Sequence, residues 1–383
     1  MTLSVPTAVP VVVICQFLVV ILQLSVDLAT LRTRVLTEIC RSSPVRRPPT
    51  STGARRPETE RDCVEQIAGP LPSADVLIEG RSLTKVYGNR PGFTAVKGID
   101  FEVFRGEAFG FLGPNGAGKS STMRMIGCVS PATCGTLRIF GLDAVRDATR
   151  IKARIGSVPQ DDALDTEMTV RENLWVYGRY FGLPRAAIRD RIERLLDFAQ
   201  LAEKTSAQVE SLSGGMKRRL TIARSLINDP EILLLDEPTT GLDPQARHLL
   251  WDRLFRLKQD GVTLILTTHY MDEAEQLCDR IAVMDRGEII ALGSPRELIE
   301  RHVTREVVEL RFIPGQQQKS AQELHGVGDD LELLPDRVLC YAQDGEAAVE
   351  EVRRRGLAPI TTLVRRSSLE DVFLRLTGRS LIE

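Results

Sequence analysis

The sequence has few of the residues that build metal clusters or disulfide frameworks. It contains four His and seven Cys in 383 residues, and no two Cys have the C-x-x-C spacing typical of zinc or redox sites. The cysteines are scattered along the chain, at Cys15, Cys40, Cys63, Cys128, Cys134, Cys278 and Cys340. We therefore expect reduced thiols, as in a cytosolic protein.

The sequence also lacks an excess of charge of either sign. Fifty Lys and Arg stand against 52 Asp and Glu, a net charge of −2. Nothing in this balance indicates binding to a nucleic-acid backbone, so nucleic acid is not among the expected partners. The 43% hydrophobic and 27% charged residues are an ordinary globular composition, and the length predicts two or three domains.

Apolar runs long enough to cross a membrane are absent from residues 76–383. The N-terminus differs, because residues 1–26 carry no charged side chain and their hydrophobic segment, 9–26, is nearly long enough to span a bilayer. Arg residues follow it and would place the rest of the chain in the cytoplasm if the segment spans. The alternative is an unstructured or wrongly assigned N-terminal extension.

Composition divides the chain into three parts. Residues 42–75 are rich in Pro, Arg, Ser and Thr and read as a disordered linker, so 1–75 is predicted to be an N-terminal extension. Residues 76–302 alternate strand-like and helix-like segments, with a helical insert near 165–225, which predicts an α/β nucleotide-binding domain. Residues 303–383 predict a small separate α+β domain.

A phosphate-binding loop is the strongest motif. "GPNGAGKS" matches G-x-x-x-x-G-K-[ST] and lies between a strand-like and a helix-like segment, which is the context this motif requires. Its backbone N–H groups would surround the phosphates. Lys119 should reach the β- and γ-phosphates and Ser120 should hold Mg²⁺. The predicted ATP-binding residues here are Gly113, Pro114, Asn115, Gly116, Ala117, Gly118, Lys119, Ser120 and Ser121.

Two carboxylates end the apolar run "EILLLDE". Asp236, at the tip of a buried strand, is placed to hold Mg²⁺ directly or through water. Glu237 is placed to orient or deprotonate an attacking water. Gln160 and His269 each follow another predicted strand, and His269 would polarise the γ-phosphate or position Glu237.

A second candidate phosphate site lies about ninety residues after the first, in "SLSGGMKRRL". Ser213 suits a helix N-cap, and the apolar spacing of Met216, Leu220, Ala223 and Ile227 predicts the helix that follows. The start of such a helix can present N–H groups to an anion.

These motifs occur in the order "GPNGAGKSS", "VPQ", "LSGGMKRR", "LLLDEPTTGLD" and "TTH". From about residue 77 to 300, the chain resembles the ATPase domain of ATP-binding cassette (ABC) transporters. The resemblance implies a P-loop NTPase fold, with a RecA-like core and with antiparallel-β and α-helical subdomains. It also implies ATP and Mg²⁺ as cofactors, with Gln160 near the metal and in catalysis.

The resemblance assigns three further features. Tyr87 would stack on adenine, and Asp243 would be the aspartate of the D-loop. The family works as a head-to-tail dimer, in which Ser213, Gly214 and Gly215 of one subunit cap the γ-phosphate bound by Lys119 of the other. Met216 stands where the family usually has Gln, a departure that leaves the phosphate-contacting residues intact.

"LSGGMKRRLTIARSLINDP", "LTTHYMDEAEQLCDRI" and "SLEDVFLRLTGR" resemble nodulation-factor export ATP-binding proteins and related drug-resistance exporter ATPases. This likeness extends to the C-terminus but excludes residues 1–75. It implies an ATP hydrolase at the cytoplasmic face of the inner membrane, paired with a separate permease, that powers export of a lipo-oligosaccharide or a hydrophobic drug-like compound. The alternative is a non-transport, membrane-associated regulatory protein that binds ATP.

Overall fold

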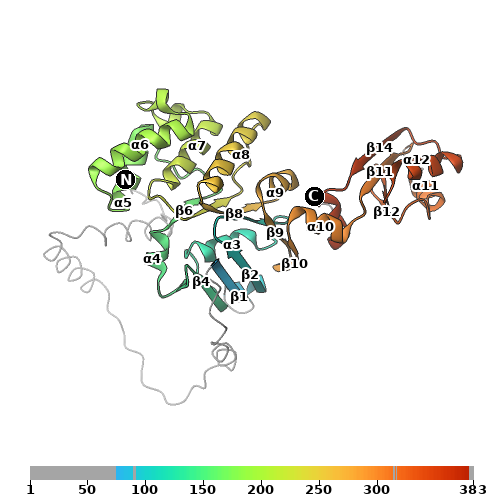
Figure 1. Ribbon diagram of the computed structural model, residues 1–383, viewed down its shortest axis with the longest axis horizontal. Helices are drawn as coiled ribbons and strands as arrows, with labels where there is room; N and C mark the ends of the chain where they lie inside the picture. The colour runs from blue at the N-terminus through green and yellow to red at the C-terminus, as the bar shows by residue number, and fades with distance from the viewer. Residues whose placement is uncertain (1–74, 89–91, 314, 316, 379–383) are drawn as a thin grey trace, which may run out of the picture.

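The computed structural model describes residues 75–88, 92–313, 315 and 317–378. The hydrophobic segment 9–26 and the Pro/Arg-rich linker of the sequence analysis lie outside these residues. Three sheets and the helices around them form an elongated molecule, with α5–α7 at one end and the C-terminal strands at the other (Figure 1).

A six-stranded sheet forms the centre, in the order β10-β9-β3-β8-β7-β6. Its strands are parallel except β10, which runs antiparallel to β9. Every residue of β3 and β8 is buried, which explains the unbroken apolar runs of the sequence. The strands are β3 (Ala108–Leu112), β6 (Ile155–Val158), β7 (Ile232–Asp236), β8 (Thr263–Thr268), β9 (Arg280–Asp285) and β10 (Glu288–Gly293).

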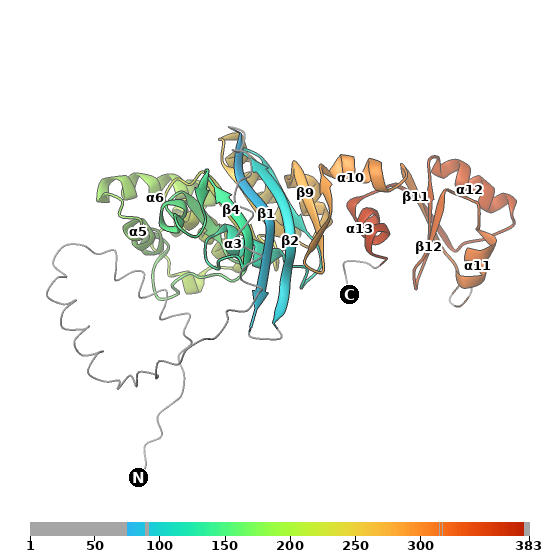
Figure 2. The ribbon, with the colours of Figure 1, turned by 90° about the horizontal axis from the view of Figure 1, so that it is seen from below.

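An antiparallel sheet of order β2-β1-β4-β5 packs on this centre. The rings of Phe101, Phe109 and Phe111 join the two sheets, with neighbouring centroids 5.2 and 5.3 Å apart. The strands β1 and β2 cross the middle of the molecule (Figure 2). The sheet consists of β1 (Val76–Tyr87), β2 (Phe93–Phe104), β4 (Cys134–Ile139) and β5 (Leu142–Asp143).

The helical insert has a core of its own. Ile188, Ile192 and Leu196 are buried in it and Leu195 is partly buried, a spacing that places all four on one face of a helix. Thr169 and Glu172 form a capping box at the start of α5, since each accepts a hydrogen bond from the other's backbone N–H. The insert contains α5 (Val170–Tyr180), α6 (Arg185–Ala199), α7 (Gly214–Ser225) and two 3-10 turns, Ala202–Lys204 and Val209–Ser211.

Five helices surround the central sheet. Residues of α8 and α9 join the hydrophobic cluster on one of its faces, and residues of α3 join the cluster on the other. These helices are α3 (Lys119–Ile126), α4 (Ala148–Lys152), α8 (Pro244–Gln259), α9 (Met271–Leu277) and α10 (Pro295–His302).

The tail is a four-stranded antiparallel sheet of order β12-β13-β11-β14, with helices α11 and α12 covering part of it. This mixture of strands and helices is the α+β character predicted for residues 303–383. The elements are β11 (Glu306–Arg311), α11 (Gln317–Glu323), β12 (Asp330–Leu333), β13 (Val338–Ala342), α12 (Gly345–Arg354), β14 (Thr361–Arg366) and α13 (Leu369–Thr377).

Helix α13 packs the tail, which the sequence predicts as a small α+β domain, onto the nucleotide-binding domain. It lies beside α10 (Figure 2). Val372 and Phe373 share a hydrophobic cluster with Leu277 of α9 and Leu298 of α10. The backbone N–H of Leu369 donates to Glu275 Oε1 at 2.8 Å. The exact boundary at residue 302 stays a prediction.

Replacing Phe373 by Ala should therefore destabilise the nucleotide-binding domain as well as the tail. The side chain is 1% exposed in a cluster shared with the central sheet, and truncating a buried Phe typically costs about 3 to 5 kcal/mol. Denaturant unfolding of the full chain measures this loss. Leu363→Ala, on an exposed side chain of β14, is the control and should change the free energy of unfolding by less than about 0.5 kcal/mol. Equal effects of the two variants would contradict the shared cluster.

Candidate functional site

The predicted phosphate loop lines a hollow of about 330 Å³ at the ends of β3, β6 and β7. This is the edge at which the parallel strands end, where ligands bind in open α/β sheets. Gln160 and Glu237, predicted from two other motifs, line the same hollow. The lining residues are Phe93, Ala95, Pro114, Asn115, Gly116, Ala117, Gly118, Lys119, Ser120, Ser121, Gln160 and Glu237.

The backbone conformation of the phosphate loop requires glycine at several of its positions. A Cβ at Gly113 would lie 2.2 Å from the Met284 carbonyl oxygen, and one at Gly118 would lie 2.6 Å from that of Ala95. Gly116 and Gly118 also have φ angles of 82° and 104°, which only glycine adopts without strain. The loop then enters α3 at Lys119, so a helix N-terminus faces the hollow and favours an anion.

Lys119 is buried, with 4% of its surface exposed. Its ammonium donates to the carbonyl oxygens of Gly113 (2.6 Å) and Pro114 (3.1 Å), and lies 4.0 Å from Glu237 Oε1. Burial lowers the pKa of Lys119, while the carboxylates of Glu237 and Asp236 act in the opposite direction. The result is a cation held at the start of a helix, which complements a phosphate.

Glu237 is the centre of the hydrogen-bonded groups in this hollow. Its carboxylate accepts from Gln160 Nε2 and Thr240 Oγ1, both at 3.2 Å, and lies 3.3 Å from His269 Nδ1. The side chain is 7% exposed. Its φ of 45° is strained for a residue other than glycine, and its N–H is held by the carbonyl and hydroxyl of Thr267, both at 3.1 Å. The carboxylate is therefore fixed in one orientation.

Asp236 and Ser120 lie together, as their motifs predicted. Ser120 Oγ donates to Asp236 Oδ1 at 3.2 Å, and Thr267 Oγ1 donates to the same oxygen. Hydroxyl and carboxylate oxygens are the ligands that Mg²⁺ prefers, so the donor set fits this ion. The amide nitrogen of Gln160 is directed to Glu237, which leaves its oxygen as the atom that could face a cation.

The second candidate phosphate site lies apart from the first. Ser213 caps α7 by accepting a hydrogen bond from the Met216 N–H at 3.3 Å, as predicted. Neither Ser213, Gly214 nor Gly215 lines the hollow around Lys119. Ser213 and Gly214 are exposed, and a Cβ at Gly214 would meet no atom within 4 Å. This helix start is thus open to a group from outside the subunit.

Asp243 lies near this second site and caps α8, accepting from the Ala246 N–H at 2.8 Å. A Cβ on Gly215 would lie 3.6 Å from the Ala246 side chain. The loop that carries Asp243 and the start of α7 therefore form one surface.

Tyr87 does not line the hollow. Its ring lies below the Lys85 ammonium, 4.9 Å from it. Phe93, opposite Tyr87 in the β1–β2 pairing, lines the hollow with 67% of its surface exposed. An exposed aromatic ring at the mouth of a phosphate site suits stacking on a purine. Phe93 is not among the residues predicted from the sequence, although an aromatic residue beginning a strand opposite Tyr87 is a signal for it.

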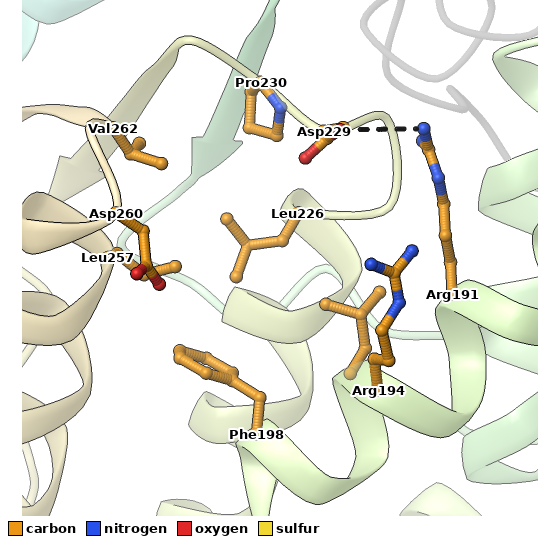
Figure 3. Close-up of a pocket in the computed structure, with 10 residues that line it drawn as sticks. Arg191, Arg194, Phe198, Leu226, Asp229, Pro230, Leu257, Asp260 and Val262 are labelled. Carbon is orange, nitrogen blue, oxygen red and sulfur yellow. Dashed lines mark ion pairs between the residues drawn. The ribbon is translucent and has the colours of Figure 1, made fainter.

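A second hollow, of about 300 Å³, lies between α6, the end of α7 and α8. Figure 3 shows Arg191 and Arg194 on one side, Asp260 on the other and Phe198 between them. Arg191 forms an ion pair with Asp229 at 3.8 Å. Because this hollow lies where β7 and β8 begin, it is at the opposite end of those strands from Glu237. We assign it no part in ATP chemistry.

Two further features concern the described residues as a whole. Among them, no group of three or more His, Cys, Asp and Glu side chains could hold a metal. In the same part of the chain, we find no helix with both the length and the apolar character needed to cross a bilayer.

A phosphate loop after β3, an acidic pair at the end of β7, a capped "LSGG" helix and a His after β8 together define an ATP-binding cassette ATPase. The ABC transporter family model matches residues 96–240, and the model of the nodulation factor export protein NodI C-terminal domain matches residues 317–378. The chain belongs to the family of Nod factor export ATP-binding protein I. The predicted fold class and resemblance are confirmed.

The relatives match over nearly their full length. The Nod factor export ATP-binding protein I of Ralstonia nicotianae is 47% identical over 322 residues, which cover 83% of this chain and 98% of the relative. That of Rhizobium meliloti strain 1021 is 48% identical, covering 82% and 91%. ATP binding therefore follows from the family.

Solved structures agree in fold. The ATP-binding cassette MJ0796, described as a dimer in a post-hydrolysis state with ADP and Pi, has a TM-score of 0.53 and 28% identity, covering 57% of this chain and 98% of that chain. CbiO1 of Clostridium perfringens, part of the transporter complex cbiONQ, has a TM-score of 0.55 and 30% identity, covering 59% and 92%.

Proposed function

We propose that this chain hydrolyses ATP to power export through a separate integral-membrane permease, and that its cargo is a lipo-oligosaccharide of the nodulation-factor kind. The observation that carries hydrolysis is the convergence of Lys119, Gln160 and His269 on the buried Glu237 carboxylate. The proposal of export follows from relatives named Nod factor export proteins, with which the chain shares its C-terminal domain as well as its ATPase domain.

The residues around the hollow would have separate roles in ATP binding and hydrolysis. Lys119 and the loop backbone would bind the β- and γ-phosphates, and Phe93 or Tyr87 would stack on adenine. Ser120, Asp236 and Gln160 would hold Mg²⁺, which when bound neutralises charge on the phosphates. Glu237 would orient or deprotonate the attacking water, and His269, 3.3 Å away, would hold the carboxylate in place.

The subunits would work as a head-to-tail homodimer. Ser213, Gly214 and Gly215 would cap the γ-phosphate held by the partner's loop, with Asp243 beside them. Two identical chains related by a twofold axis would then share two ATP sites. Tighter binding of ATP to the closed dimer than to the open one would supply the mechanical work. The dimer would sit at the cytoplasmic face of the inner membrane, held there by the permease.

Transport in inverted membrane vesicles tests this function. Vesicles containing this chain and its membrane permease should accumulate a labelled lipo-chitooligosaccharide when ATP is added. Vesicles with the Glu237→Gln chain should not. ATP-dependent accumulation of a hydrophobic fluorescent dye, without the oligosaccharide, would replace the proposed cargo by a drug-like one.

The competing function is a membrane-associated regulatory protein that binds ATP without turnover. The intact set of Lys119, Asp236, Glu237 and His269 argues against it. Phosphate release from ATP by the purified chain distinguishes the two, because only the transport ATPase should turn over.

A further inference from the structure

Arg218 is a buried cation that none of the roles above uses. It lies on α7, five residues after Ser213, and only 4% of its surface is exposed. The nearest carboxylate is that of Asp162, 3.8 Å away. Its guanidinium instead donates hydrogen bonds at 2.6 to 3.2 Å to five main-chain oxygens, those of Pro159, Gln160, Asp236, Glu237 and Pro238.

These five oxygens belong to the two segments that carry the hydrolytic side chains. Residues 159 and 160 follow β6, and residues 236–238 end and follow β7. Beyond the end of a strand, the sheet no longer supplies hydrogen-bond partners, and buried carbonyl groups left unpaired are costly. The planar guanidinium, with five donors in a fixed arrangement, can satisfy both segments at once, which the single ammonium of Lys cannot.

The geometry at Glu237 shows what the hydrogen bonds of Arg218 control. The strained φ of 45° is held from one side by Thr267, which accepts from the Glu237 N–H, and from the other by Arg218, which donates to the Glu237 carbonyl. Arg218 also donates to the carbonyl of Gln160, whose side chain donates to the Glu237 carboxylate at 3.2 Å. One guanidinium therefore fixes the backbone of both Gln160 and Glu237.

We propose that Arg218 is a positioning residue that aims the Glu237 carboxylate by fixing the main chain of Gln160 and Glu237. Helix α7 would thus support hydrolysis in its own subunit, in addition to the part proposed for its start toward the partner's ATP. This inference rests on the proposed role of Glu237.

Arg218→Lys tests it while keeping the charge. We expect kcat to fall by about 10- to 100-fold, because moving a catalytic carboxylate by about 1 Å can slow the reaction by that factor. KM should change little, because the phosphate loop is unaltered. Arg219→Lys is the matched control. Arg219 lies on the same helix but donates to Ala199 and Gln200 instead of the strand ends. The kcat of the Arg219→Lys protein should therefore stay within about twofold of the parent.

A double variant separates positioning from general stability. If Arg218 acts through Glu237, adding Arg218→Lys to Glu237→Gln should not slow single-turnover hydrolysis any further. If the two losses multiply instead, or if Arg218→Lys has the parental kcat, the inference is overturned. A Glu237→Gln protein at the parental rate would overturn the proposed function itself. Should Arg218→Lys not fold, Arg218→Gln is measured by the same cycle.

Discussion

Replacing Glu237 by Gln is expected to slow ATP hydrolysis by about 10² to 10⁴, the usual loss when a positioned base is removed. Gln has nearly the same shape, and its oxygen can still accept from Thr240 and Gln160, so the site should keep its packing. The change removes the negative charge and the basicity of the carboxylate. ATP should bind as before, because the loop contacts of Lys119 and the glycines are unaltered.

Phosphate release measures the first effect and binding of a fluorescent ATP analogue measures the second. Glu288→Gln is the control, because this carboxylate lies on β10, exposed and paired with Lys97 at 3.2 Å, outside the site. It should hydrolyse ATP at the parental rate. Hydrolysis by Glu237→Gln within a few-fold of the parent would show that another group activates the water.

The sequence predicted the parts of the site whose geometry is local. The glycines of the phosphate loop, the cap at Ser213 and the strand that ends at Asp236 depend on residues close in the chain. A recognisable order of motifs then joined Gln160, Glu237 and His269 into one site. The structure does bring Gln160, Glu237 and His269 together.

The features that could not be predicted from the sequence depend on contacts between segments far apart in the chain. "MKRR" contains three basic residues in a row, and nothing in their order says that Arg218 is buried while Arg219 lies at the edge of α6. Thr240 and Thr267 look like ordinary hydroxyl residues until the fold places them against the acidic pair. Likewise, the apolar face of α13 predicts burial but not its partner, which is the surface of α9 and α10.

Replacing Ser213 by Arg should abolish ATP-driven dimerisation while leaving ATP binding to the monomer intact. The side chain is exposed at the open start of α7. A bulky cation there would occupy the place proposed for the partner's γ-phosphate. The ATP site around Lys119 contains no part of this helix start, so each monomer should bind ATP with unchanged affinity. Loss of the cap itself costs only about 1 kcal/mol, too little to unfold the domain.

The experiment uses the Glu237→Gln background, where closed dimers should accumulate, and measures the mass in solution with and without ATP. Ser211→Arg is the matched control, since Ser211 is also exposed but ends the 3-10 turn before the helix start; this protein should dimerise on ATP. A Ser213→Arg protein that still dimerises would show that the start of α7 does not bridge the subunits. One that fails to bind ATP as a monomer would place this phosphate site in its own subunit. That result would contradict the head-to-tail dimer, because the bridging arrangement requires the two phosphate contacts of each ATP to come from different chains.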